Sequence, residues 1–252
     1  MISKRLLIII LSILLVSFVP DKKKITVWLC GDSTMSIKDP RYYPETGWGM
    51  PFVYFFDSTV SIENRAKNGR STKTFISEKL WQSVIDNAKE GDYVFIQFGH
   101  NDEAKEKVER YTTPEEYKAN LLKFVNESRN KKAQPILLTP VTRRRFDANG
   151  NILQTHEIYS GLVRELAAAE KVPLIDLDKK SQELLQQFGK DNSKWLFLQL
   201  QAGEHPNYPD GRDDNTHFNE LGARLVAELV LKEIKNLNLE LSERIKVFPP
   251  AK

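Results

Sequence analysis

Short apolar runs alternate along this chain with longer segments in which apolar side chains recur at helical spacing. The apolar runs predict buried strands at 25–30, 60–62, 93–98, 135–141 and 173–177. The helical spacing predicts helices at 71–88, 113–129, 156–170, 179–188 and 219–235. Residues 190–216 carry neither pattern and are expected to be mostly irregular. Because strands that alternate with helices form parallel sheets covered on both faces, the chain is predicted to be a three-layer α/β/α protein with about five parallel strands.

The N-terminus has the pattern of a targeting segment. Lys4 and Arg5 precede an apolar run at 6–19, which is shorter than the ~20 residues that a membrane-spanning helix needs. Residues 1–21 are therefore predicted to be an export signal, and the protein is expected in the periplasm or outside the cell. An uncleaved membrane anchor is the alternative, because the run is followed by a lysine cluster at 22–24 and by no clear Ala-x-Ala cleavage site.

The bulk composition is that of a single globular domain at 22–252. The chain has 252 residues, of which 40% are hydrophobic and 28% charged, enough for a substantial core. The formal net charge of +3 gives no reason to expect nucleic-acid binding. Cys30 is the only cysteine, so an intrachain disulfide is not possible. The sequence leaves the oligomeric state open.

Polar residues of catalytic type follow the predicted strands. Ser33 follows the first strand, Gly69 the second and Asn101 the third, while an arginine run at 143–145 follows the fourth. Active sites of open α/β sheets lie beyond the carboxyl ends of the strands. These residues are therefore expected to share one rim of the sheet.

A serine hydroxyl becomes a nucleophile when a neighbouring base takes its proton and a third group orients that base. Ser33 is the predicted nucleophile and His217 the predicted base, with Asp214 bound to the other ring nitrogen. Asp210 and Asp213 compete with Asp214 for that role. Taken singly, Ser33 is equally well interpreted as a turn residue, and Asp214 as a helix cap.

Attack on a carbonyl creates an oxyanion, which needs preorganised hydrogen-bond donors. The candidates are the backbone amides of Ser33 and Gly69 and the side-chain amide of Asn101. Glycine lets the backbone approach a ligand closely because no side chain intervenes. The alternatives are an ordinary turn glycine and a loop asparagine that bonds its own backbone.

Four blocks of sequence together resemble the SGNH (GDSL-type) hydrolases. They match that family at Ser33, Gly69, Asn101 and His217, in the family's order. Further blocks resemble one branch, the rhamnogalacturonan acetylesterases of carbohydrate esterase family 12. These are Gly31-Asp32-Ser33-Thr34-Met35, Gly47-Trp48-Gly49, Asn64-Arg65-Ala66 leading to Gly69-Arg70-Ser71, Gln97-Phe98-Gly99-His100-Asn101-Asp102 and Asp214-Asn215-Thr216-His217-Phe218. The resemblance implies a flavodoxin-like fold, removal of acetyl groups from pectic polysaccharide, and neither a metal nor an organic cofactor.

Residues that would bind an acidic polysaccharide are predicted less sharply than the catalytic residues. Arg143, Arg144 and Arg145 would hold galacturonate carboxylates in guanidinium forks, with a solvated basic run as the alternative. Trp48 would stack on a sugar face, as Trp195 would, although loop tryptophans more often anchor packing. His205 belongs to the long loop expected beside the site.

Three other functions are consistent with parts of the sequence. The first is an esterase of the same fold that acts on xylan, a lipid or a thioester. The second is a metal-dependent phosphoesterase, whose ligands would come from Asp32, His100, Asp102, Asp214 and His217. The order Gly-His-Asn-Asp at 99–102 does not match the Gly-Asn-His-Asp signature of that class. The third is a glycan-binding protein without catalysis, which would not need a serine and histidine pair.

Overall fold

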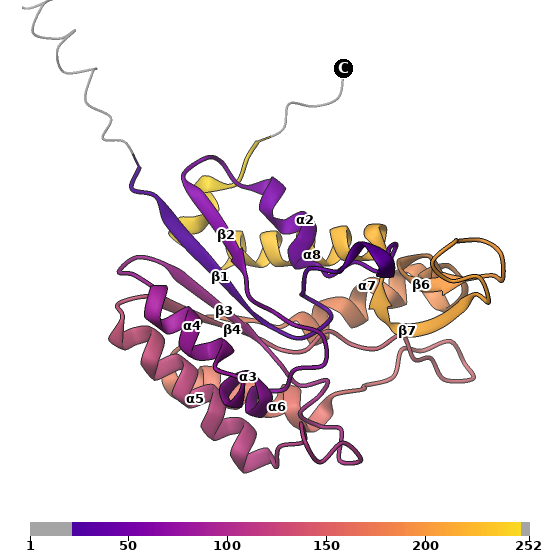
Figure 1. Ribbon diagram of the computed structural model, residues 1–252, viewed down its shortest axis with the longest axis horizontal. Coiled ribbons are helices and arrows are strands. Elements are labelled where there is room, and N and C mark those ends of the chain that lie inside the picture. The colour runs from indigo at the N-terminus through magenta and orange to yellow at the C-terminus, as the bar shows by residue number, and fades with distance from the viewer. Residues whose placement is uncertain (1–21, 248–252) are drawn as a thin grey trace, which may run out of the picture.

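The strands of this computed structural model, which describes residues 22–247, form a central parallel sheet (Figure 1). Its members are β1 (Ile25–Gly31), β2 (Val60–Asn64), β3 (Tyr93–Gln97), β4 (Gln134–Leu138) and β5 (Leu174–Ile175). They lie in the order β2-β1-β3-β4-β5, and every neighbouring pair is parallel. This is the flavodoxin-like order, with its topological switch point between β1 and β3. The predicted fold class is confirmed.

Helices cover both faces of the sheet (Figure 1). They are α2 (Gly49–Phe52), α3 (Thr72–Ser77), α4 (Leu80–Asn87), α5 (Pro114–Asn130), α6 (Glu157–Glu170), α7 (Leu177–Asn192) and α8 (Glu220–Asn236). Side chains alternate along each strand, so Val27 and Leu29 pack against the face under α2, α7 and α8. Trp28 and Cys30 pack against the opposite face, under α3 to α6. The two resulting cores bury both faces, as a parallel sheet requires.

The helix predicted at 71–88 is in fact two helices, α3 and α4. Ser71 caps α3 by accepting a hydrogen bond from the Thr74 amide, and the Thr74 hydroxyl accepts one from the Ser71 amide in return. The break falls at Lys79, whose φ of 58° is left-handed and cannot continue a helix. Apolar side chains keep their helical spacing across this break, which is why the sequence predicted a single helix at 71–88.

The prediction that 190–216 would be mostly irregular is wrong in part. β6 (Phe197–Leu200) and β7 (Arg212–Phe218) form an antiparallel pair beside the main sheet (Figure 1). β7 contains Asp213, Asp214 and Asn215, residue types that are depleted in strands, so propensity gave no signal for it.

The predicted export signal at 1–21 lies outside the described residues. Across 22–247, the structure contains no helix with the length and apolar character needed to cross a membrane.

Candidate active site

The carboxyl ends of β1 and β3 and the edge of β7 meet at one rim of the molecule. Ser33 lies in the turn that leaves β1. The Asp32 side chain stabilises this turn, because its Oδ1 accepts hydrogen bonds from the Thr34 amide at 2.9 Å and the Thr34 hydroxyl at 2.8 Å. Gln97, at the end of β3, donates to the same hydroxyl at 2.7 Å. The turn that carries Ser33 is therefore fastened to two neighbouring strands.

Ser33, His217 and Asp214 form one continuous chain of hydrogen bonds. His217 Nε2 lies 2.9 Å from Ser33 Oγ, and His217 Nδ1 lies 2.8 Å from Asp214 Oδ2. The side chains of Asp214 and His217 are 9% and 26% exposed, so the carboxylate is shielded while the ring edge stays open. The residues predicted as nucleophile, base and orienting group are thus brought together, across 184 positions of the chain.

A register irregularity in β7 explains how Asp214 and His217, three positions apart, can contact each other. Regular pairing joins Phe197 to Phe218 and Gln199 to Asp213, and the register shifts in between. Asp214 Oδ1 accepts from the backbone amides of Thr216 at 2.8 Å and His217 at 2.9 Å, which curls the strand around the carboxylate. Irregularities of this kind re-aim side chains next to active sites. Here it turns the His217 ring toward Asp214.

The competing aspartates lie elsewhere. Asp213 accepts a hydrogen bond from Gln199 Nε2 at 2.9 Å and borders a different hollow from the one that contains Ser33. Asp210 borders that other hollow too. Only Asp214, of the three candidates, bonds to the His217 ring.

Asp214 is held as a carboxylate. Burial alone would raise the pKa of Asp214, but the hydrogen bond and charge of His217, with the amides of His217 and Thr216, lower the pKa far below its ordinary value. Arg212 adds a guanidinium 3.3 Å from Oδ2. An ionised Asp214 accepts a hydrogen bond from His217 Nδ1–H, which fixes the ring tautomer and leaves Nε2 free to accept a proton from Ser33.

A buried lysine holds the backbone of the turn that carries Ser33. Lys38 Nζ donates to the Ser33 carbonyl oxygen at 2.5 Å and to Asn68 Oδ1 at 2.8 Å, and it pairs with Glu45 Oε1 at 2.7 Å. The side chains of Lys38 and Glu45 are only 2% and 11% exposed. Sequence reasoning missed both residues, because a lone lysine and a lone glutamate in a predicted loop carry no pattern.

The residues predicted to supply the oxyanion donors, Ser33, Gly69 and Asn101, line one cavity with the Ser33 hydroxyl. In the described part of the chain, the backbone amides of Ser33 and Gly69 donate to no other protein atom. Gly69 has a φ of 74°, a conformation that glycine adopts without strain. Asn101 Nδ2 donates to the Arg70 carbonyl at 3.0 Å, and its Oδ1 accepts from Arg110 at 3.1 Å. These bonds fix the orientation of the Asn101 amide and leave its second N–H for a ligand.

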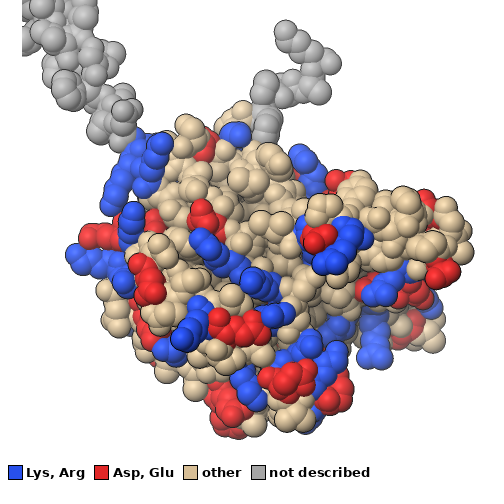
Figure 2. Space-filling view, viewed as in Figure 1, with Lys and Arg blue, Asp and Glu red and all other residues tan. Residues whose placement is uncertain are grey.

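A cavity of about 570 Å³ opens over these residues. Ser33, Gly69, Asn101 and His217 line it together. Its remaining wall is rich in cations, supplied by Lys107, Arg110, Arg143 and Arg212, with Glu45 and Glu106 as the acidic members besides Asp214. On the face in Figure 2, by contrast, basic and acidic side chains are interspersed over the described surface. Basic side chains thus outnumber acidic ones in this cavity by four to three.

Three of the cavity's cations were missed from the sequence. Lys107 and Arg110 lie in the loop that follows β3, where charged residues are common and carry no pattern. Arg212 is two positions before Asp214 on β7. Strand alternation would have pointed to Arg212, had 212–218 been recognised as a strand.

The three predicted arginines have three different positions. Arg143 lines the cavity and donates to the Thr216 hydroxyl at 2.8 Å. Arg144 instead ties β7 to the end of α7, because it donates to Asn215 Oδ1 at 2.7 Å and to the Lys190 carbonyl. Arg145 is exposed and lies outside the cavity wall. Arg144 is thus committed to protein partners, which contradicts its predicted role in binding galacturonate, whereas carboxylate binding by Arg143 and Arg145 stays a prediction.

Trp48 and His205 are also not part of the cavity wall. Trp48 is fully buried and donates to Gln97 Oε1 at 2.7 Å, so its ring is a core residue and the prediction of sugar stacking is wrong. His205 packs against Tyr43, with ring centroids 5.5 Å apart, and its Nδ1 accepts from the Asn207 amide. It stabilises the loop after β6 and is absent from the lining of the Ser33 cavity.

Buried titratable groups around the rim have shifted pKa values. Burial lowers the pKa of His100 well below its ordinary value, and its ring packs edge-on against His156 at 4.3 Å between centroids. Asp102 accepts from the Thr72 amide and from the Thr72 and Thr112 hydroxyls, and burial raises its pKa to about 7. Among residues 22–247, no group of three or more His, Cys, Asp and Glu side chains is arranged to hold a metal ion.

Comparison with known proteins gives concordant matches. The sequence model described as "GDSL-like Lipase/Acylhydrolase family" matches residues 29–225. Rhamnogalacturonan acetylesterase RhgT of Bacillus subtilis is 43% identical over 224 residues, which are 89% of this chain and 95% of that protein.

Two solved structures show the same fold. The Bacillus subtilis protein YxiM superposes with a TM-score of 0.75 at 25% identity, over 86% of this chain and 58% of that one, so this chain spans less than two thirds of its length. An acetylxylan esterase from Geobacillus stearothermophilus superposes with a TM-score of 0.62 at 18% identity, over 87% of this chain and 96% of that one. The second likeness is one of fold alone.

Proposed function

Because this chain belongs to the GDSL-like lipase/acylhydrolase family, we propose that it is a serine acetylesterase that removes acetyl groups from a rhamnogalacturonan-type pectic polysaccharide. The observation that carries the proposal is the hydrogen-bonded chain from Ser33 through His217 to Asp214. The 43% identical relative, a rhamnogalacturonan acetylesterase, supports the substrate class.

The proposed reaction has two halves. As Ser33 Oγ bonds to the acetyl carbon, His217 Nε2 takes its proton, and Asp214 stabilises the imidazolium that forms. Collapse of the tetrahedral intermediate breaks the bond to the sugar oxygen, which leaves with the proton from His217. Water then gives a proton to His217 and attacks the acetyl-enzyme, and Ser33 leaves with that proton as acetate is released.

The negative oxygen of each intermediate would be bound by three donors. The free amides of Ser33 and Gly69 and the second N–H of Asn101 border the same cavity as the hydroxyl. Arg110 supports this arrangement, because its guanidinium holds Asn101 Oδ1 at 3.1 Å. Such donors act in a fixed geometry, so they stabilise the developing charge without reorganising.

The charge of the cavity favours an acidic polymer. Besides Arg212, which pairs with Asp214, three cationic side chains line it, and of these Arg110 and Arg143 carry guanidinium groups suited to carboxylates. A neutral polymer such as xylan has no carboxylate in its backbone for these groups to bind. Galacturonate residues next to an acetylated sugar would bind here, and this distinguishes the proposed substrate from acetylated xylan.

The test compares parent and Ser33→Ala proteins on three substrates: acetylated rhamnogalacturonan, acetylated xylan and 4-nitrophenyl acetate. The parent should release acetate from the first faster than from the second. Ser33→Ala should lower every rate by several orders of magnitude while the Tm stays close to that of the parent. Equal activity of parent and variant would overturn the mechanism, and a preference for xylan would overturn the substrate class.

A further inference from the structure

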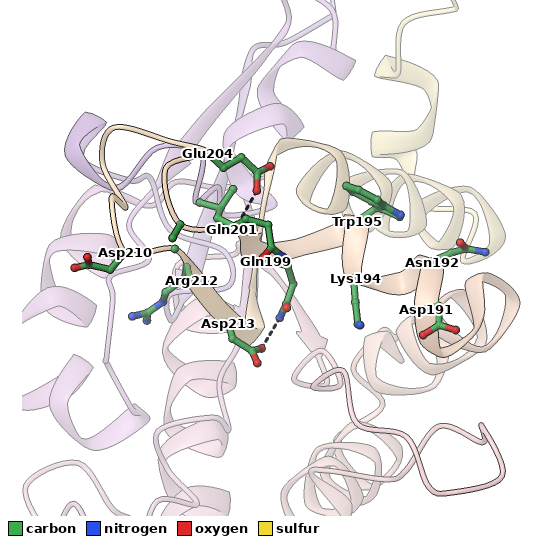
Figure 3. Close-up of a pocket in the computed structure, with 13 residues that line it drawn as sticks. Asp191, Asn192, Lys194, Trp195, Gln199, Gln201, Glu204, Asp210, Arg212 and Asp213 are labelled. Atoms are coloured by element: carbon green, nitrogen blue, oxygen red, sulfur yellow. Dashed lines mark hydrogen bonds between the residues drawn. The ribbon is translucent and has the colours of Figure 1, made fainter.

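A second, larger hollow of about 880 Å³ borders β6 and β7 and does not include Ser33 in its lining (Figure 3). One wall comes from the end of α7 and the turn after it, with Asp191, Lys194 and Trp195. The other wall comes from β6, β7 and the loop between them, with Gln199 and Asp213. Nothing in the proposed mechanism uses this hollow.

Trp195 is the unusual residue of this wall. It is 70% exposed, whereas Trp28, Trp48 and Trp81 are each at most 5% exposed. A large aromatic ring left in solvent forgoes the free energy of burial that the other three gain. An exposed indole at the edge of a hollow is the usual platform for the apolar face of a sugar ring, which covers the indole while the sugar hydroxyls remain available for hydrogen bonds.

The rest of the lining has groups that recognise hydroxyls and repel carboxylates. The planar amides of Asn192, Gln199 and Gln201 offer donors and acceptors. The charged side chains are Asp191, Glu204, Asp210 and Asp213, against Lys194 and Arg212. Arg212 is already paired with Asp214. Acidic side chains therefore outnumber basic ones in this hollow, whereas the Ser33 cavity has a small excess of basic ones, and the charge of the hollow favours an uncharged sugar over a uronate.

The two hollows are adjacent, because Arg212 lines both of them. Asp213 and Asp214 are consecutive on β7, yet Asp213 borders the outer hollow and Asp214 the Ser33 cavity. A polysaccharide that crosses the edge of β7 at Arg212 would thus meet a basic site and then an acidic one. A polymer that contains both galacturonate and neutral sugar has that alternation of charge.

We propose that the hollow beside Trp195 is a binding subsite for an uncharged sugar residue of the same polysaccharide chain whose acetylated residue lies at Ser33. The subsite rests on the proposed function, because it assumes a polymeric substrate. It adds affinity for the chain without contacting the ester. Its effect is therefore expected on long substrates and not on small ones.

The first experiment is kinetic. Trp195→Ala should lower kcat/KM on acetylated rhamnogalacturonan about tenfold more than on 4-nitrophenyl acetate, mainly through KM, because an aryl acetate cannot span both hollows. Tyr54→Ala is the matched control, since Tyr54 is an exposed aromatic residue, 71% accessible, that borders neither hollow. It should leave both constants at the parental values. An equal effect of Trp195→Ala on both substrates, or none on either, would overturn the subsite.

The second experiment uses tryptophan fluorescence, since Trp195 is the one exposed indole of the four in the chain. In the Ser33→Ala protein, rhamnogalacturonan oligosaccharides should protect Trp195 from acrylamide quenching. Homogalacturonan oligosaccharides, which contain only uronates, should protect it much less. Equal protection by both would overturn the assignment to an uncharged sugar.

Two further outcomes separate this proposal from its alternatives. An apolar hollow with Pro44, Leu198 and Leu221 lies on another side of Trp195, so a second copy of the chain is the competing occupant. Protection that rises with protein concentration in the absence of sugar would assign Trp195 to that contact and overturn the subsite. If the parent fails to release acetate from any substrate, the proposed function fails, whereas active parent protein with an unaffected Trp195→Ala variant refutes only the subsite.

Discussion

Replacing the buried Lys38 by methionine should lower the Tm by about 6–20 °C. The ammonium contacts three acceptors, Glu45 Oε1, Asn68 Oδ1 and the Ser33 carbonyl oxygen, all within 2.8 Å. Methionine fills similar space but donates nothing, so the nearly buried Glu45 carboxylate loses its cation. Breaking a buried pair from one side costs about 3–5 kcal/mol of unfolding free energy. In a protein of this size each kcal/mol shifts the Tm by roughly 2–4 °C, which gives the stated range.

A matched control separates burial from charge. Lys22 pairs with Glu243 at 3.5 Å, with both side chains well exposed, so Lys22→Met should change the unfolding free energy by about 1 kcal/mol or less. Thermal unfolding followed by circular dichroism measures both variants. If Lys38→Met melts within the same margin as Lys22→Met, the argument that burial makes this pair important is refuted.

A double variant distinguishes the stabilising role of Lys38 from its positioning role. Lys38→Met with Glu45→Gln removes the orphaned carboxylate and should recover a large part of the lost Tm. It should not recover kcat on 4-nitrophenyl acetate, because the Ser33 carbonyl oxygen still lacks its donor and the nucleophile is less firmly placed. Recovery of Tm and kcat together would show that Lys38 affects activity only through stability.

Three further predictions concern the rim of the sheet. Asn101→Ala should lower kcat on an aryl acetate about 10²–10³-fold, as expected for the loss of one oxyanion donor, with stopped-flow or steady-state kinetics as the check. Arg110→Gln should raise KM for acetylated rhamnogalacturonan more than KM for 4-nitrophenyl acetate, because it removes a guanidinium from the cavity wall. Burial raises the pKa of Asp102 from 3.8 to about 7, so the folded protein keeps a proton there that the unfolded chain releases, and the unfolding free energy falls as pH rises across that interval. Asp102→Asn should flatten this fall in urea titrations at a series of pH values, and an unchanged slope would refute the shift.

The sequence predicted the sheet and the rim because both depend on local patterns and one topological rule. Apolar runs marked the strands, and parallel strands bring their carboxyl ends to one side. That rule alone placed Ser33, Gly69 and Asn101 near one another. The pairing with His217 was predicted from residue chemistry, because a serine nucleophile needs a base, and not from the sheet topology, because β7 lies outside the main sheet and its composition did not predict a strand.

The incorrect predictions concern where loop side chains point, which depends on contacts between distant segments. The segment with Trp48 packs directly on the serine turn, since a Cβ on Gly47 would lie 2.1 Å from the Ser36 carbonyl oxygen. The Trp48 amide also donates to the Thr34 carbonyl at 2.9 Å, which directs the indole into the core. Arg144 finds its partner Asn215 at a separation of 71 positions. Neither contact has a signature in the local sequence.

The nucleophile and its base belong to different parts of the architecture. Ser33 lies in the turn after β1 of the central sheet, whereas Asp214 and His217 belong to β7. Backbone hydrogen bonds from the Thr46 amide to the Phe218 carbonyl and from the Arg144 amide to the Asn215 carbonyl hold β7 in place. The loop at 201–211 joins β6 to β7 and borders the outer hollow without bonding to any of the three. Apart from Asn207 and Tyr208, which bond to the carbonyls of Pro40, Tyr42 and Tyr43, side chains of that loop can be exchanged without removing a bond to the hydrolytic residues. It is a natural place for engineering or evolution to change which polymer is accepted without rebuilding the chemistry.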